Sequence, residues 1–426
     1  MFSQRRPPCQ RNLTQRHRSA GAALTVSLTP VPSTGRRLLL TEKFPVTILF
    51  ALQYGAFVLF PSYIHNTAPL GLIVTICAVG IGTAFFVEAL RFPLGRRSTK
   101  PISLSPNAAM YVVSVGWLAA IGGSITGGVA YVNQTTSASP SRLAAVFTPL
   151  TYWLIIGTVL VMAQAADGVV NRSRAWQVAL LGFVLELALS IRAAILSDVV
   201  TYSIVVTFIA IVLGFVRWRW VVVALLTLPV VLPLLYNLKT QERSNLSQVS
   251  EPGQQSNYGQ RLRLDLELAQ VKDFPTIPAA ANIKAPSIPT LLEFGLLPRV
   301  LDQGRGTLHT GESLSVAVGG VPTSSDSATS FGDAYIVDGW TGVILYSGLA
   351  AQVTGVVVRR RGPWAFALLA IITQKSLLVE QSCPDMLAGL LQSCLSLAAA
   401  LVVIQLLSRK IVRLGQLVLA GYDSAS

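Results

Sequence analysis

VALLGFVLELALSIRAA, residues 178–194, is the clearest indication of the fold class of this chain. It carries only two charged side chains, Glu186 within the apolar run and Arg192 near its end. About 20 apolar residues span roughly 30 Å of hydrocarbon as an α-helix, and a helix satisfies its own backbone hydrogen bonds there. The stretch therefore predicts a membrane-spanning helix.

The same kind of run recurs along the 426 residues, of which 52% are hydrophobic and only 12% charged. We predict an all-α polytopic membrane protein with about ten transmembrane helices, arranged as seven helices, a large polar segment and three more helices. The predicted spans lie near 44–64, 69–90, 108–131, 144–165, 175–191, 195–216, 221–236, 335–358, 363–380 and 387–407.

The basic residues predict the orientation, because cytoplasmic loops carry an excess of Lys and Arg. If the N-terminus is cytoplasmic, 22 of the 33 basic residues fall on the inner side. The tails 1–43, which we expect to be disordered, and 408–426 are then both cytoplasmic, and 237–334 forms a large extracytoplasmic loop. Most of the net charge of +14 belongs to this signal, so it does not indicate binding to nucleic acid.

The sequence lacks the motifs that would indicate several kinds of chemistry. The four cysteines show neither metal-ligand spacing nor a disulfide framework. The basic N-terminus has no apolar core before a cleavage site, so it does not resemble a signal peptide. With no phosphate-binding loop, dinucleotide fingerprint or Ser/His/Asp grouping, we expect neither a cofactor nor a metal, and any chemistry would depend on arginines and carboxylates.

The predicted outer loop holds two notable stretches, although its ten acidic residues outnumber its eight basic ones. Within RLRLDLELAQVKDF, residues 261–274, strict alternation at the start indicates a strand, while the whole stretch also fits a short interfacial helix, which we favour. LLPRVLDQGRGTLHTGE, residues 296–312, contains Arg299 and Arg305, whose planar guanidinium groups suit a phosphate. Glu312 is a candidate for proton transfer, and His309 a weaker one.

Charged residues inside or beside the predicted spans have two interpretations each, because they are costly in a membrane and are commonly functional there. Arg192 is either a functional cation or an anchor that reaches the outer surface. Lys375, expected near the middle of its span, either pairs with Glu186 or holds a lipid phosphate. At the start of the eighth span, Asp333 is a candidate for capping the helix, and it cannot share one helical face with Asp338.

Three places resemble the O-antigen (Wzy-type) and exopolysaccharide repeat-unit polymerases of bacteria, which belong with the O-antigen ligases. LSIRAAIL, residues 189–196, is similar to the family's arginine at the outer end of a central span. YGQRLRLDLELAQV and GLLPRVLDQGRGT look like its Arg-containing loop helix and its aliphatic-Pro-Arg motif, with Arg305-Gly306 where the family has Lys-Pro. TSFGDAYIVDGWTGV, residues 329–343, resembles its glycine-containing entry to the next span.

The resemblance implies a polymerase/ligase membrane fold of the GT-C-like type in the bacterial cytoplasmic membrane. It also implies metal-independent transfer of a glycan from polyprenyl diphosphate to the terminal sugar of another lipid-linked unit. The diphosphate would be bound by arginines, and a carboxylate would act as the base. The candidates are Arg192, Arg299, Arg305 and Arg261 for the diphosphate, and Asp333 and Glu312 for the base.

Three alternatives stay open beside the polymerase. One is a ligase-type glycan transferase, which shares the architecture. Another is a flippase or other transporter of lipid-linked oligosaccharides, in which Glu186, Arg192 and Lys375 would line a pathway. The third is a non-catalytic member of a polysaccharide assembly complex. The expected partners are a polyprenyl-diphosphate-linked oligosaccharide, membrane lipid, and a chain-length regulator and flippase of the same pathway.

Overall fold

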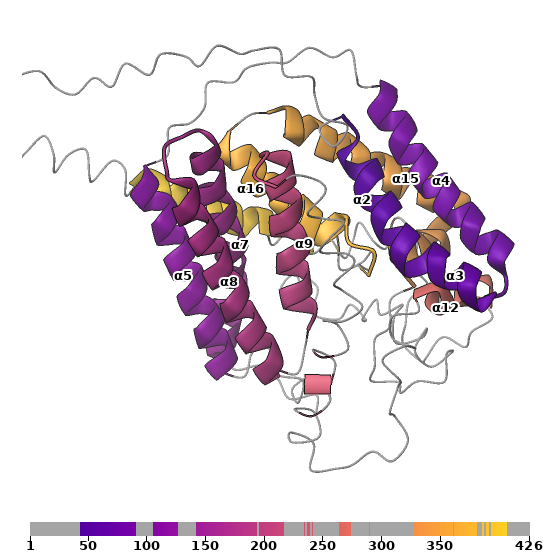
Figure 1. Cartoon of the computed structure of the whole chain (residues 1–426), viewed down its shortest axis with the longest axis horizontal. Helices are drawn as coiled ribbons and strands as arrows, with labels where there is room; N and C mark the ends of the chain where they lie inside the picture. The colour runs from indigo at the N-terminus through magenta and orange to yellow at the C-terminus, as the bar shows by residue number, and fades with distance from the viewer. Residues whose placement is uncertain are drawn as a thin grey trace, which may run out of the picture. The chain divides into compact units, whose positions relative to one another are not determined.

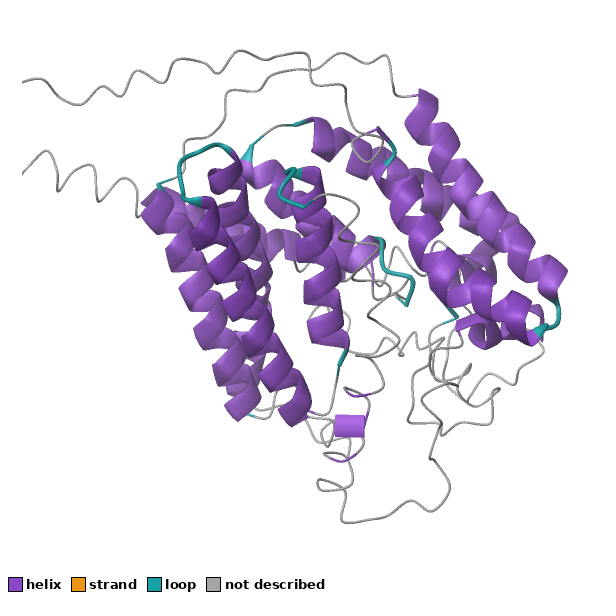
Figure 2. Cartoon of the chain, viewed as in Figure 1, coloured by secondary structure: helices purple, strands orange, loops and turns teal. Residues whose placement is uncertain are grey.

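The computed structural model describes helices and turns, and no strand occurs among the residues that it describes (Figure 2). This confirms the all-α class. The described residues are 43–90, 105–126, 142–193, 196–216, 234, 237–238, 241, 264–273, 289, 328–360, 362–380, 386, 389–391 and 393–406.

Within these ranges, seven helices are long and apolar enough to cross a membrane, which confirms a polytopic membrane protein (Figure 1). The predicted spans overlap with helices except 221–236, of which only Leu234 is among the described residues. The helices are α2 (Pro45–Tyr54), η1 (Gly55–Leu59), α3 (Phe60–His65), α4 (Leu70–Leu90), α5 (Pro106–Ile125), α7 (Arg142–Ala166), α8 (Arg172–Ala193), α9 (Ser197–Val212), α12 (Leu264–Ala269), η2 (Gln270–Asp273), α15 (Ser330–Arg359), α16 (Pro363–Ser376) and the final helix Gly389–Leu406.

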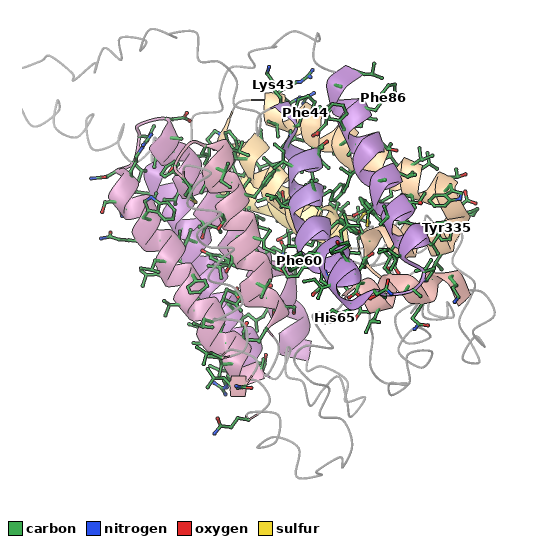
Figure 3. All side chains as sticks on the ribbon, turned by 45° about the vertical axis from the view of Figure 1, so that its right-hand side comes forward. Lys43, Phe44, Phe60, His65, Phe86 and Tyr335 are labelled. Carbon is green, nitrogen blue, oxygen red and sulfur yellow. The ribbon has the colours of Figure 1, made fainter. Side chains whose placement is uncertain are left out.

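The first span is made of α2, the π-helical turn η1 and α3, and it packs against α4. A carboxylate joins the two segments, because Glu88 near the end of α4 is buried and accepts hydrogen bonds from the backbone N–H groups of Val46 and Thr47, at 3.0 and 3.1 Å. These N–H groups at the start of α2 have no partner within the helix. Figure 3 labels Phe44 and Phe86 at this end, and His65 at the other. Glu88 therefore fixes how α2 and α4 pair.

Glycine allows α5 and α7 to approach closely. A methyl group at Gly116 would collide with the backbone of Leu154, and one at Gly157 would lie 2.6 Å from the backbone nitrogen of Val113. Small residues at helix contacts are typical of membrane proteins, where packing replaces the hydrophobic effect as the driving force. Much of α7 is buried, so it is a central helix among its neighbours.

The helix α15 is broken within its apolar run. Asp338 and Gly339 have non-helical backbone angles, with a φ of 55° at Gly339, so residues 330–337 and 340–359 form two helical pieces. At the start of α15, the Thr329 hydroxyl accepts a hydrogen bond from the N–H of Gly332 at 3.2 Å. The expectation that Asp333 caps this helix was therefore wrong, because Thr329 already occupies the capping position and Asp333 lies in the first turn.

Two helices are shorter than the predicted spans. α9 has 16 residues, and α16 has 14 residues and ends at Ser376 instead of continuing to residue 380. A helix of 14 residues is only about 21 Å long, which is less than the thickness of the hydrocarbon core. Lys375 consequently lies in the last turn of α16 and not near the middle of a span, which corrects its predicted position.

Candidate functional site

Tyr202 sets the register between α8 and α9. Its hydroxyl donates a hydrogen bond to the carbonyl of Ala179 at 3.1 Å, and its ring end lies so close to Gly182 that a methyl group there would collide with it. The two helices run in opposite directions, and residues four apart share a helical face. One turn further along both helices, Glu186 therefore lies opposite Asp198.

The two carboxylates interact as this register requires. The charge of Asp198 acts on Glu186 as a like charge, and Lys375 acts on Asp198 as an opposite charge. Glu186 is half-buried, whereas Asp198 has open surface on one side and is crowded by the chain on the other. We call Glu186, Asp198 and Lys375 the charged cluster. It joins α8, α9 and α16.

The side chain of Lys375 is held on two further sides. Its Nζ lies 5.0 Å from the ring centroid of Tyr152 on α7, a cation–π contact. A methyl group at Gly389 would lie 2.9 Å from Cδ and 3.5 Å from Nζ of Lys375, so the lysine stem runs across this glycine. The last turn of a helix also favours a cation. Of the two interpretations of Lys375, pairing with a carboxylate fits better, and its partner is Asp198.

A polar network stabilises the end of α16, where backbone groups extend beyond the helix. Gln53 on α2 donates to the carbonyl of Leu377 at 2.9 Å and accepts from the N–H of Val379 at 3.0 Å. The Val379 carbonyl accepts from the N–H of Ser330 at 2.8 Å, and the Tyr346 hydroxyl donates to the carbonyl of Ser376. An apolar environment offers no water to replace these partners, so the network is needed for the helix to end there.

Aromatic rings surround this network. Tyr54 stacks on Phe331 with ring centroids 4.1 Å apart, and Phe50 meets Phe331 edge-on at 5.0 Å. The Tyr54 hydroxyl accepts a hydrogen bond from the N–H of Phe331 and shares another with the hydroxyl of Ser330. The first span is therefore tied to the start of α15 by ring stacking and hydrogen bonds together.

The segment α12–η2 is helical, which confirms the prediction of a helix, and not a strand, within 261–274. It packs against η1, α3, α4 and α15 (Figure 1). Asp265 is fully buried and accepts a hydrogen bond from the Thr67 hydroxyl, while Leu268 and Val271 contact Gly332 at the start of α15. Residues 264–273 thus pack onto η1, α3, α4 and the start of α15, and Asp265 is not a solubilising surface charge.

Only two of the predicted diphosphate and base residues, Arg192 and Asp333, lie in the described part of the chain. Arg192 is exposed at the end of α8. Asp333 is 1% exposed, and its neighbour Gly332 is covered by α12–η2. Arg261, Arg299, Arg305, His309 and Glu312 lie outside the described residues. The structure therefore brings no two of the predicted diphosphate and base residues together within its described part.

Sequence reasoning missed the residues that the structure brings together most clearly. Asp198 follows Glu186 by twelve residues, and only the Tyr202–Gly182 contact shows that the two face each other. The sequence did not indicate a role for Gln53, because a single glutamine in an apolar run does not show which backbone groups it will bond. No group of three or more His, Cys, Asp or Glu side chains suited to a metal occurs in the described ranges.

Comparison of the chain with protein-family models finds no match, and comparisons with curated proteins and with solved structures find none either.

Proposed function

We propose that the protein is a polysaccharide polymerase that joins lipid-linked glycan units at the outer face of the bacterial cytoplasmic membrane. The observation that supports it best is the docking of α12–η2 onto η1, α3, α4 and the start of α15. A loop that binds a lipid-linked substrate must lie against the membrane surface. A loop that only connects two spans has no need of the buried Asp265–Thr67 hydrogen bond.

The proposed reaction forms a bond between the anomeric carbon and the acceptor oxygen, and breaks the bond from that carbon to the diphosphate. Negative charge develops on the leaving diphosphate, and fixed cations there would accelerate the step. Arg192 is suited to this role because it is exposed where α8 ends, and Arg299 and Arg305 are assigned with it. Arg261, just before α12, is a further candidate.

The proton of the acceptor hydroxyl is assigned to a carboxylate, Glu312 or Asp333. The burial of Asp333 bears on this choice, because α12–η2 covers the start of α15 and would have to move before substrate reached that side chain. Glu312 is therefore the preferred base. A ligase-type transferase would use the same groups with a different acceptor.

The test is deletion of the gene and complementation with Arg192→Ala, Arg299→Ala or Arg305→Ala, followed by separation of the polymer by length on a gel. We expect each variant to shorten or abolish the polymer at normal protein levels. Normal polymer from all three variants would refute the diphosphate assignment. Polymer that is made but not attached would identify a ligase.

A transporter of lipid-linked oligosaccharide is the second candidate, and two observations favour it. The break of α15 at Asp338–Gly339 and the early end of α16 are interruptions of the kind that form binding sites in transporters. The charged cluster also spans three helices. Flipping of a fluorescent polyprenyl-diphosphate glycan in proteoliposomes, without any change in its length, would support this candidate over the polymerase.

A further inference from the structure

The charged cluster has an unbalanced charge. Its two carboxylates, Glu186 and Asp198, face each other across α8 and α9, and Lys375 supplies one positive charge. With all three groups ionised, the cluster has a net charge of −1. Excess charge beside apolar helices is costly, and like charges at one place oppose each other's ionisation. The uptake of one positive charge would remove both costs.

Ser190 independently indicates a ligand at this place. It lies one turn after Glu186, so both side chains are on the same face of α8. The side chain is only 3% exposed, and its hydroxyl has no hydrogen-bond partner among the described residues. On the neighbouring helix α9, Ser203 donates to the carbonyl four residues earlier at 2.6 Å, whereas Ser190, like Ser376 on α16, makes no such bond among the described residues. A buried hydroxyl left without such a bond has both a donor and an acceptor to offer beside Glu186.

The other polar groups that face Glu186 are already engaged. The Tyr202 hydroxyl donates to Ala179 and lies 3.2 Å from the hydroxyl of Thr158, and Tyr152 lies against Lys375. Lys375 interacts with Asp198. Within the described part of the chain, Glu186 itself forms no hydrogen bond, so it is the group with free capacity for a bound cation.

We propose that the charged cluster binds one proton, held on the Glu186 carboxyl group between Asp198 and Ser190. The proton comes from water at the end of α9 where Asp198 has open surface, and its binding converts a carboxylate into a carboxylic acid, leaving the cluster neutral. Ser190 then accepts from the acid O–H or donates to its carbonyl. This site is separate from the proposed diphosphate site and does not depend on the substrate.

The test is infrared spectroscopy of the purified full-length protein in lipid nanodiscs. At about pH 6 ordinary Asp and Glu side chains stay ionised, so a carboxylic-acid carbonyl band there reports an unusual group. We expect wild type to show such a band, Glu186→Gln to lose it, and Ser190→Ala to shift its frequency without removing it. Asp167→Asn, which removes an exposed carboxyl in the turn after α7, is the matched control and should keep the band unchanged.

Several outcomes would overturn the proposal. The band could be absent in wild type, or persist at full strength in Glu186→Gln. Thermal stabilisation of wild type by NaCl but not by KCl, lost in Glu186→Gln, would show that the cluster holds Na⁺ instead. If Glu186→Gln does not fold, Glu186→Asp should shift the band, and an unshifted band would contradict the assignment. None of these readouts requires a glycan substrate, so they are independent of the polymerase proposal.

Discussion

Replacement of Gln53 with leucine tests the polar network that ends α16. The substitution keeps the side-chain size roughly constant but removes the donor to the Leu377 carbonyl and the acceptor for the Val379 N–H. Hydrogen bonds inside membrane proteins contribute about 0.6 kcal/mol on average and about 1.7 kcal/mol at most. Both backbone groups lie beyond the helix and Gln53 is buried, so we use the upper value for each bond. Gln53→Leu should therefore lower the free energy of unfolding by about 3 kcal/mol.

The assay is equilibrium unfolding of purified protein in lipid or mild detergent, measured for wild type, Gln53→Leu and a matched control. Gln177→Leu makes the same substitution at an exposed position on α8, and surface changes of this kind usually stay within about 0.5 kcal/mol. A difference of 3 kcal/mol corresponds to a change of about 100-fold in the folding equilibrium. If Gln53→Leu were as stable as Gln177→Leu, the network would not hold the end of α16.

Three further predictions concern other contacts. Gly389→Leu should displace Lys375 from Tyr152 and lower the thermal stability, whereas Gly389→Ala should do so less; equal melting temperatures for wild type and Gly389→Leu would contradict the packing. Thr67→Val should release α12–η2 and speed cleavage near it in limited proteolysis, while unchanged cleavage would show that the hydrogen bond does not hold the segment. Arg192→Ala should reduce glycan transfer on the order of 100-fold or more if the proposed diphosphate contact is correct, as a comparison of initial rates with wild type will show.

The membrane class and most helix positions follow from the sequence because one physical requirement governs them. An apolar run must be long enough to cross the hydrocarbon, and its backbone N–H and C=O groups must form their hydrogen bonds within the run. That requirement places α4, α5, α7 and α8 without any knowledge of their neighbours. It fails for α16, which ends early, because its last backbone groups are satisfied by other helices and not by the helix itself.

The charged cluster shows why site prediction is harder. Glu186, Arg192 and Lys375 stood out in the sequence because charges are costly in a membrane. Their partners depend on the rotation of each helix, and that rotation is fixed by contacts such as Tyr202 against Gly182. The sequence therefore indicated which helices carry unusual charges, but not that Asp198 joins Glu186 and Lys375.

Capping shows the same limit at a smaller scale. Asp333 and Thr329 both suit a helix start, and residue type alone does not separate them. The structure separates them. Thr329 has a φ of 72° and its hydroxyl accepts a hydrogen bond from the N–H of Gly332, which leaves Asp333 within the first turn. Glu88 likewise caps α2 from 42 residues away, a contact that no local pattern indicates.

Reconstitution from purified components tests the proposed transfer of lipid-linked glycans directly. Purified protein in nanodiscs is given a polyprenyl-diphosphate-linked oligosaccharide, and the products are separated by length. If the proposed transfer is correct, wild type and Gln177→Leu produce a ladder of longer lipid-linked glycans, and Arg192→Ala does not. A substrate that stays the same length with folded wild-type protein, or a ladder undiminished by Arg192→Ala, would contradict it.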